Sequence, residues 1–239
     1  MSDNSINTIV DCVFDIFFES DYVAENFLNI ISTIDDFEEI IKLPLHQIPD
    51  AIRKNDPNLK LQPLYEIRSS TNQEYKILLG DNTIGIAIHD KYSSWSKSFF
   101  PQIQKIFSLI FESKKIKTIN RMGLRYVDFL EDENIFDTGK IKVDIDKIPA
   151  TDKKMFLRIE DHVEQVSYNK VITNKTQHLT SSNTGSIVDI VTYIDTKPFI
   201  LDDTFDKDDF FNDVDKLHNI NKDKFKEVID DERIRKYGL

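Results

Sequence analysis

The sequence predicts an α+β fold in which helices pack on antiparallel sheets. Three patterns indicate it. Apolar and polar side chains alternate over residues 10–18, which is typical of a half-buried strand. A turn-forming Gly-Asp-Asn at 80–82 separates two strand-like segments. Two further segments, 95–110 and 210–228, carry apolar residues at helical spacing.

The first half of the chain is predicted to contain a strand, a connection, three strands and a helix. The opening strand spans 8–19 and has Cys12 on its apolar face, and a helix over 22–34 follows. After a connection that contains four prolines, three strands are expected at 64–68, 74–79 and 83–89. The clearest helix spans 93–112, with Trp95 on its buried side. Pro101 either kinks this helix or lies in its first turn.

The second half is predicted to repeat this plan. A long strand at 116–130 is followed by an irregular stretch. Three strands are then expected at 154–160, 163–173 and 186–195. The final helix spans 206–230, and its acidic first turn suits the helix dipole. We therefore expect two similar halves, 1–113 and 114–239, in one compact unit, although no repeat is visible residue by residue.

Composition limits the location and the partners of the protein. The net charge of -11 argues against a general nucleic-acid binder, because such binding depends on surface Lys and Arg; nucleic acid is left open but not favoured. Cys12 is the only cysteine, so an intramolecular disulfide is excluded and a reducing compartment is expected. No apolar run of 18 residues and no signal-peptide pattern are present. A cytoplasmic protein without a membrane partner is expected.

The most distinctive segment is the predicted strand at 120–128. Arg121, Gly123 and Arg125 share one of its faces, and the two arginine Cα atoms lie about 13 Å apart at roughly 3.3 Å per residue. Two guanidinium groups that converge over Gly123 could hold a carboxylate or a phosphate. Alternatively, each arginine pairs with a carboxylate on a neighbouring strand. The pattern is compatible with an anion-binding site at Arg121, Gly123 and Arg125 and with two ion pairs.

The apolar stripe of the final helix contains a polar pair. Asn221 lies in the middle of the stripe, and His218 lies at its edge. Buried polar groups destabilise a fold unless they are hydrogen-bonded. Either backbone carbonyl groups of the sheet satisfy His218 and Asn221 and hold the helix in register, or His218 lines a cavity as a base or a ligand.

Sequence motifs for known chemistry do not occur in the chain. The five histidines have no paired helical spacing, and no cysteine cluster exists, so no metal site is predicted. A G-x-S-x-G elbow, an activated-cysteine signature and a glycine-rich phosphate loop are all missing. The sequence therefore predicts no catalytic residue, no metal and no cofactor, and it favours a protein that is not an enzyme.

Several segments together resemble one protein family. They are the strand at 10–18, Tyr-x-x-Trp at 92–95, Arg-x-Gly-Leu-Arg-Tyr at 121–126, Leu-His-x-x-Asn-x-x-x-Phe at 217–225, and Tyr-Gly at 237–238. In this order, over nearly the whole chain, they resemble a sporadically distributed family of uncharacterised prokaryotic proteins. That family has Asn two residues after the strand tyrosine, where this chain has Asp128. The resemblance implies no substrate or cofactor, and the sporadic distribution implies accessory genes such as those of phage defence.

Three functions are compatible with these patterns. The leading hypothesis is a non-enzymatic binding or regulatory module, a sensing or adaptor subunit of a phage-defence or toxin–antitoxin system with a protein partner encoded nearby. The first alternative is an enzyme acting on a phosphate-bearing substrate or nucleic acid, with Arg121 and Arg125 holding the anion and His218 as base. The second is a small-molecule receptor whose final helix closes over a sheet-lined cavity. An enzyme should gather these three side chains around one cleft. The oligomeric state is not predicted.

Overall fold

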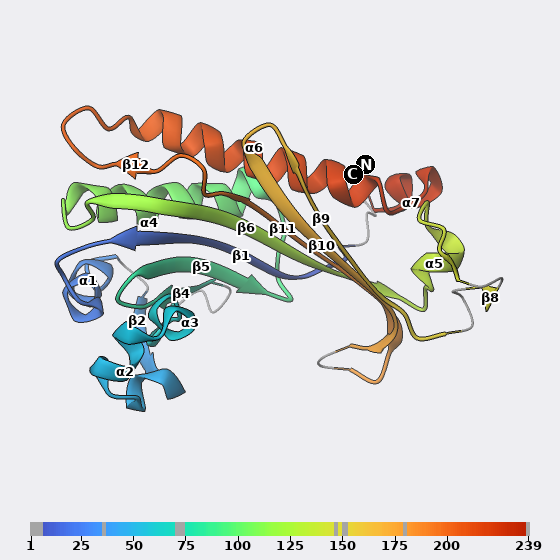
Figure 1. Ribbon diagram of the computed structural model, residues 1–239, viewed down its shortest axis with the longest axis horizontal. Coiled ribbons are helices and arrows are strands. Elements are labelled where there is room, and N and C mark those ends of the chain that lie inside the picture. The colour runs from blue at the N-terminus through green and yellow to red at the C-terminus, as the bar shows by residue number, and fades with distance from the viewer. Residues whose placement is uncertain are drawn as a thin grey trace. The chain divides into compact units, whose positions relative to one another are not determined.

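A computed structural model describes residues 7–34, 37–69, 75–145, 148–149, 153–178 and 181–237 (Figure 1). Its strands are β1 (Ile9–Glu19), β2 (Phe37–Lys42), β3 (Tyr65–Ser69), β4 (Tyr75–Leu79), β5 (Thr83–His89), β6 (Thr118–Glu131), β7 (Asp144–Ile145), β8 (Ile148–Pro149), β9 (Phe156–Val163), β10 (Val166–Gln177), β11 (Thr184–Ile194) and β12 (Phe199–Ile200). Its helices are α1 (Ala24–Ile31), α2 (Asp50–Asn55), α3 (Pro57–Lys60), α4 (Phe100–Glu112), α5 (Ile135–Thr138), α6 (Lys207–Lys226) and α7 (Asp231–Lys236), with helical turns η1 (Pro44–Gln47) and η2 (Trp95–Phe99). The α+β class is confirmed. Of the predicted positions, Glu74 and Gly238 lie outside the described residues.

Ten strands of the described residues form one antiparallel sheet. The hydrogen-bonded order is β2-β3-β4-β5-β1-β6-β11-β10-β9, and β12 pairs with β6. From the central strand outward, the first half runs β1, β5, β4, β3, and the second half runs β6, β11, β10, β9. Each half thus places its opening strand beside the last strand of its three-stranded meander, as expected for two similar halves. The first half has one further strand, β2, outside β3.

The chain divides into two compact units whose segments interleave. Unit 1 comprises the described residues of Met1–Cys12, Leu124–Tyr193 and Lys216–Leu239, and unit 2 comprises those of Val13–Gly123 and Ile194–Asp215. The strands β1 and β6 and the helix α6 contribute residues to both units, and β11 does so through its last residue, Ile194. The predicted boundary between residues 113 and 114 falls within unit 2.

Aromatic rings fill the core of unit 2. Phe14 of β1, Phe107 of α4 and Phe210 of α6 are each 0% exposed, and their ring centroids lie 5.1 to 6.3 Å apart. Phe14 meets the other two rings edge-on, the arrangement that the charge distribution of aromatic rings favours. Within unit 2, α4 and the first part of α6 therefore pack on the same strand.

The helix predicted at 93–112 begins with the π-helical turn η2 and continues as α4. Pro101 lies in the first turn of α4, where the regular α-helix begins directly after η2, so the second of its two predicted placements is confirmed. Trp95 is only 9% exposed and donates from Nε1 to Asp215 Oδ1 at 2.7 Å. It anchors η2 in unit 2, as expected.

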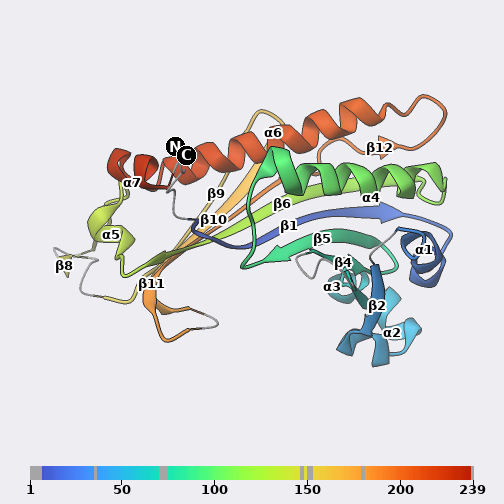
Figure 2. The same cartoon turned by 180° about the vertical axis from the view of Figure 1, so that it is seen from behind.

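A second apolar cluster forms the core of unit 1. It joins the strands β6, β10 and β11 to α5, to the end of α6 and to the chain after it, through Leu130, Ile172, Ile190, Phe136, Phe225, Val228 and Tyr237. Both views show α5 and α7 side by side at one end of this unit (Figures 1 and 2). The predicted stripe of the final helix is buried along its length, because Phe210, Val214, Leu217, Asn221, Phe225 and Val228 are all at most 4% exposed.

Candidate functional site

Arg121 of β6 forms an ion pair within unit 2. Its Nη1 donates to Asp15 Oδ1 of β1 at 3.0 Å, and its guanidinium carbon lies 4.7 Å from the centre of the Phe17 ring. A Cβ atom added at Gly123 would lie 2.9 Å from Arg121 Nη2 and 2.9 Å from Asp15 Oδ1. Gly123 thus gives room for the ion pair to lie against the strand backbone.

Arg125 forms a separate ion pair within unit 1. Its Nε and Nη2 donate to the two carboxylate oxygens of Asp189 on β11, at 2.9 and 2.8 Å. This bidentate geometry matches the planar guanidinium to the carboxylate. An added anion would have to compete with Asp15 at Arg121 and with Asp189 at Arg125. The geometry fits the two-ion-pair interpretation, and anion binding at Arg121, Gly123 and Arg125 stays a prediction.

Asn221 fastens α6 to the sheet of unit 1. It is 2% exposed, and its Nδ2 donates to Ile190 O at 2.9 Å and to Leu124 O at 3.4 Å. These two carbonyl groups belong to β11 and β6. A buried amide with such partners costs little stability, and it fixes the position of the helix along the strands. This is the arrangement that the register interpretation of the polar pair requires of Asn221.

His218 hydrogen-bonds a side chain of the sheet through one of its two ring nitrogens. Its Nδ1 lies 3.0 Å from the hydroxyl group of Tyr126, and the imidazole is half-buried. Tyr126 also hydrogen-bonds the thiol of Cys12, which is 0% exposed. Burial raises the pKa of Cys12 well above its ordinary value, so the thiol stays protonated and inert. The three side chains form a polar string inside unit 1 that runs from the buried Cys12 to the half-buried His218.

Asp128 of β6 is a buried carboxyl group in unit 1. It is 5% exposed, and Thr8 Oγ1 donates to its Oδ1 at 2.6 Å. Burial raises the pKa of Asp128 to about 7; the Thr8 hydroxyl opposes the shift, and the negative charge of Asp189 adds to it. A protonated carboxyl group has one donor and an acceptor, which approaches the hydrogen-bonding capacity of an asparagine side chain.

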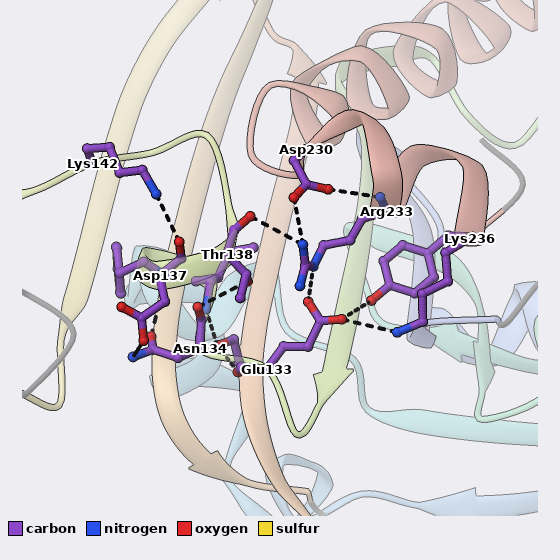
Figure 3. Close-up of polar contacts among 12 residues, drawn as sticks. Glu133, Asn134, Asp137, Thr138, Lys142, Asp230, Arg233 and Lys236 are labelled. Atoms are coloured by element: carbon purple, nitrogen blue, oxygen red, sulfur yellow. Dashed lines mark hydrogen bonds and ion pairs between the residues drawn. The ribbon is translucent and has the colours of Figure 1, made fainter.

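Glu133, which follows β6, binds three side chains from the last described residues of the chain (Figure 3). Arg233 Nε donates to Glu133 Oε2, Lys236 Nζ lies 3.2 Å from Oε1, and Tyr237 Oη donates to Oε1 at 2.9 Å. Burial alone would raise the pKa of Glu133, but the hydrogen bonds from Arg233, Tyr237 and Lys236 outweigh it and lower the pKa. The carboxylate therefore stays ionised and holds α7 in place.

Further bonds surround this cluster (Figure 3). Arg233 Nη1 donates to Asp230 Oδ2 at 2.6 Å and to Thr138 O of α5 at 3.3 Å. Asp230 also caps α7, because its Oδ1 accepts from the backbone N–H of Arg233 at 2.9 Å. The guanidinium group thus joins α7 to both α5 and Glu133.

A cavity of about 520 Å³ opens beside this cluster in unit 1. Its wall comes from the start of β1, the end of β6, the β10–β11 turn and the end of α7. Lys236 and Tyr237 line it and also bind Glu133. Opposite charges occur on its wall, because Glu131 and Lys236 both contribute. His178 adds an imidazole ring whose centroid lies 4.7 Å from that of Phe129.

Sequence reasoning missed Glu133 and this cavity. Glu133 is one of 42 acidic residues, and its three partners lie about one hundred residues later, so no spacing connects them. The terminal tyrosine that contributes to the family resemblance, Tyr237, was the one signal that pointed to this end of the chain. His218 and Asn221, which the sequence did single out, are not among the lining residues described for the cavity.

Comparison with known proteins does not assign the chain to a family. No protein-family model matches the chain, and a search of curated proteins finds no match. Across the described residues, no group of three or more His, Cys, Asp or Glu side chains could hold a metal ion. None of the helices in the described ranges is long and apolar enough to cross a membrane.

Proposed function

We propose that the chain is a non-enzymatic binding module whose ligand site is the polar cavity of unit 1. The observation that carries this proposal is the cavity itself. Its volume of about 520 Å³ is in the range of small-molecule sites. The wall carries the carboxylate of Glu131 and the amide of Asn183, which are bonded to each other, the ammonium group of Lys236, which is bonded to Glu133, and the imidazole of His178. A ligand would exchange bonds with the first three groups. These groups suit a small polar molecule that carries both charges.

The predicted site residues already have hydrogen-bond partners within the chain. This supports a binding protein over an enzyme that acts on a phosphate-bearing substrate. A phosphoryl-transfer enzyme needs donors that are available to substrate oxygens. In this chain Asp15 accepts a bond from Arg121, and Asp189 accepts two from Arg125. His218 is bonded to Tyr126 through Nδ1. The residues assigned to catalysis in the enzyme hypothesis thus have structural partners.

The position of Lys236 and Tyr237 gives the module a way to report binding. Both residues line the cavity and hold α7 through Glu133. A ligand that contacts Lys236 would change the balance of bonds at Glu133, and the equilibrium position of α7 would follow. On this basis we keep the proposal of a cytoplasmic sensing or adaptor subunit of a prokaryotic defence or toxin–antitoxin system, with a protein partner. We also propose membership of the sporadically distributed family that the chain resembles.

The test is a thermal-shift screen with amino acids, nucleotides and sugars, followed by calorimetric titration of each hit. A ligand at one hundred times its Kd adds about 2.7 kcal/mol to the free energy of unfolding, which a melting curve detects. We expect His178→Ala to weaken a true cavity ligand at least tenfold. The matched control is His89→Ala, because His89 is half-exposed on β5 of unit 2.

Three outcomes would contradict the proposal. The first is a library without any hit on the wild-type protein. The second is equal affinity of the wild type and His178→Ala for every hit. The third is chemical conversion of a hit by the protein, detected by mass spectrometry, because it would show an enzyme.

A further inference from the structure

The strand β9 ends the sheet within the described residues. It pairs with β10 over eight consecutive residues without a register shift, and β10 is its sole strand partner in that part of the chain. In the first half of the chain the corresponding strand is β3, which β2 covers. The second half therefore lacks, in its described residues, the strand that completes the first half. The outer edge of β9 presents a row of backbone donors and acceptors to a further strand.

The two ends of the sheet differ in how well they would accept another strand. The ladder of β2 is interrupted between Phe37 and Glu39, and such irregularities discourage edge pairing. In contrast, β9 is regular and carries exposed side chains on one face. Phe156 is 66% exposed. Arg158 and Glu160 form an ion pair with each other along the strand, and their side chains are 56% and 60% exposed, so both can exchange this partner for one on a second copy.

The sequence of β9 is complementary to itself when two copies run antiparallel. With Ile159 opposite Ile159, Arg158 of each copy faces Glu160 of the other, and Phe156 faces His162. Opposite residues of antiparallel strands share a face, so both charge pairs form on the exposed side. If the centre of the pairing moves by one residue, from Ile159 to Glu160 or to Arg158, the residue at the new centre faces its own copy. Glu160 then lies opposite Glu160, or Arg158 lies opposite Arg158. Those registers bring like charges together, which destabilises the pairing.

We propose that this chain forms a homodimer in which β9 of one copy pairs antiparallel with β9 of a second copy about Ile159. The contact joins two sheets edge to edge. No residue of β9 is among the lining residues described for the cavity of unit 1, so the dimer does not depend on the proposed ligand. Both Arg158–Glu160 contacts lie across the two-fold axis, which makes the interface isologous.

The test exchanges charges on β9 and follows the mass of the particle by sedimentation velocity over a concentration series. We expect the wild type to form dimers as concentration rises. Arg158→Glu alone and Glu160→Arg alone should each be monomeric, because like charges then face each other. An equimolar mixture of these two variants should restore dimers, since every facing pair is again opposite in charge. The double variant Arg158→Glu/Glu160→Arg should dimerise like the wild type.

Two controls separate pairing from misfolding. Arg235→Glu reverses a charge at an exposed side chain of unit 1, away from β9 in the sequence, and should leave the dimer intact. All variants should keep the wild-type circular dichroism and melting temperature, because these side chains are exposed. A wild type that stays monomeric at every concentration would overturn the proposal. Dimers in both single variants, or a mixture that stays monomeric, would overturn it as well.

Discussion

Replacing Asp128 by asparagine should remove a pH dependence of the free energy of unfolding. The folded state holds the pKa of Asp128 at about 7, mainly through burial, whereas an unfolded aspartate titrates near 4. Between these values the folded state keeps a proton that the unfolded state has lost. The protonated Asp128 side chain makes its full contribution to the free energy of unfolding below about pH 4. This contribution decreases as the pH rises and is lost above about pH 7.

The size of the effect follows from the pKa difference. Each unit corresponds to about 1.4 kcal/mol, so three units amount to roughly 4 kcal/mol above pH 7. The asparagine introduced by Asp128→Asn would not titrate and could still accept the bond from Thr8 through its side-chain oxygen. The variant should therefore match the wild type near pH 4. It should be more stable by about 2 kcal/mol at roughly pH 5.5 and by about 4 kcal/mol at roughly pH 8.

Urea unfolding of wild type and Asp128→Asn at several pH values measures this difference directly. The control is Asp203→Asn, which makes the same chemical change at a fully exposed side chain and should give a constant, small difference. Parallel curves for wild type and Asp128→Asn would refute the reasoning, because they would mean that Asp128 titrates alike in the folded and unfolded states. A variant that is less stable than the wild type at high pH would refute it too.

Three other predictions concern core and ion-pair residues. Trp95→Ala should cost about 3–5 kcal/mol in urea unfolding, as large core truncations do, whereas an unchanged midpoint would place Trp95 at the surface. Arg121→Ala and Arg125→Ala should each cost at most about 1 kcal/mol, and the double variant should be additive, because each arginine has its own carboxylate. Phosphate should shift the melting temperatures of these variants and the wild type equally; a shift confined to the wild type would instead favour the anion site. Cys12 should react with a thiol reagent only after unfolding, since it is 0% exposed, and rapid labelling of the native protein would contradict its burial.

The long elements of the fold could be predicted from the sequence because their patterns repeat over many residues. Alternation identified β1, and the apolar stripe identified α6, since burial on one side fixes a period of two or of 3.6. The short elements β2, α5, β12 and α7 were not predicted. Segments of two to six residues carry too few positions for a period to appear, and tertiary contacts decide their conformation.

The candidate site was less predictable than the fold. The sequence placed Arg121, Gly123 and Arg125 on one face, but it could not show that Asp15 and Asp189 lie beside the arginines, because strand order joins residues that are far apart in the chain. The cavity of unit 1 depends on four separate segments that meet only in the folded protein. Polar residues without a repeating pattern give no sequence signal for such a site.

The interleaving of the two units also sets an order on folding during synthesis. All residues of unit 2 have been translated by Asp215, whereas unit 1 still lacks its segment from Lys216 to Leu239. At roughly 5–20 residues per second the ribosome needs on the order of one to five seconds for it. Over that interval Leu130, Ile172 and Ile190 lack the apolar cover that Phe225 and Val228 provide. We therefore expect slower translation of residues 216–239 to prolong the exposure of these side chains and to increase aggregation of the nascent chain.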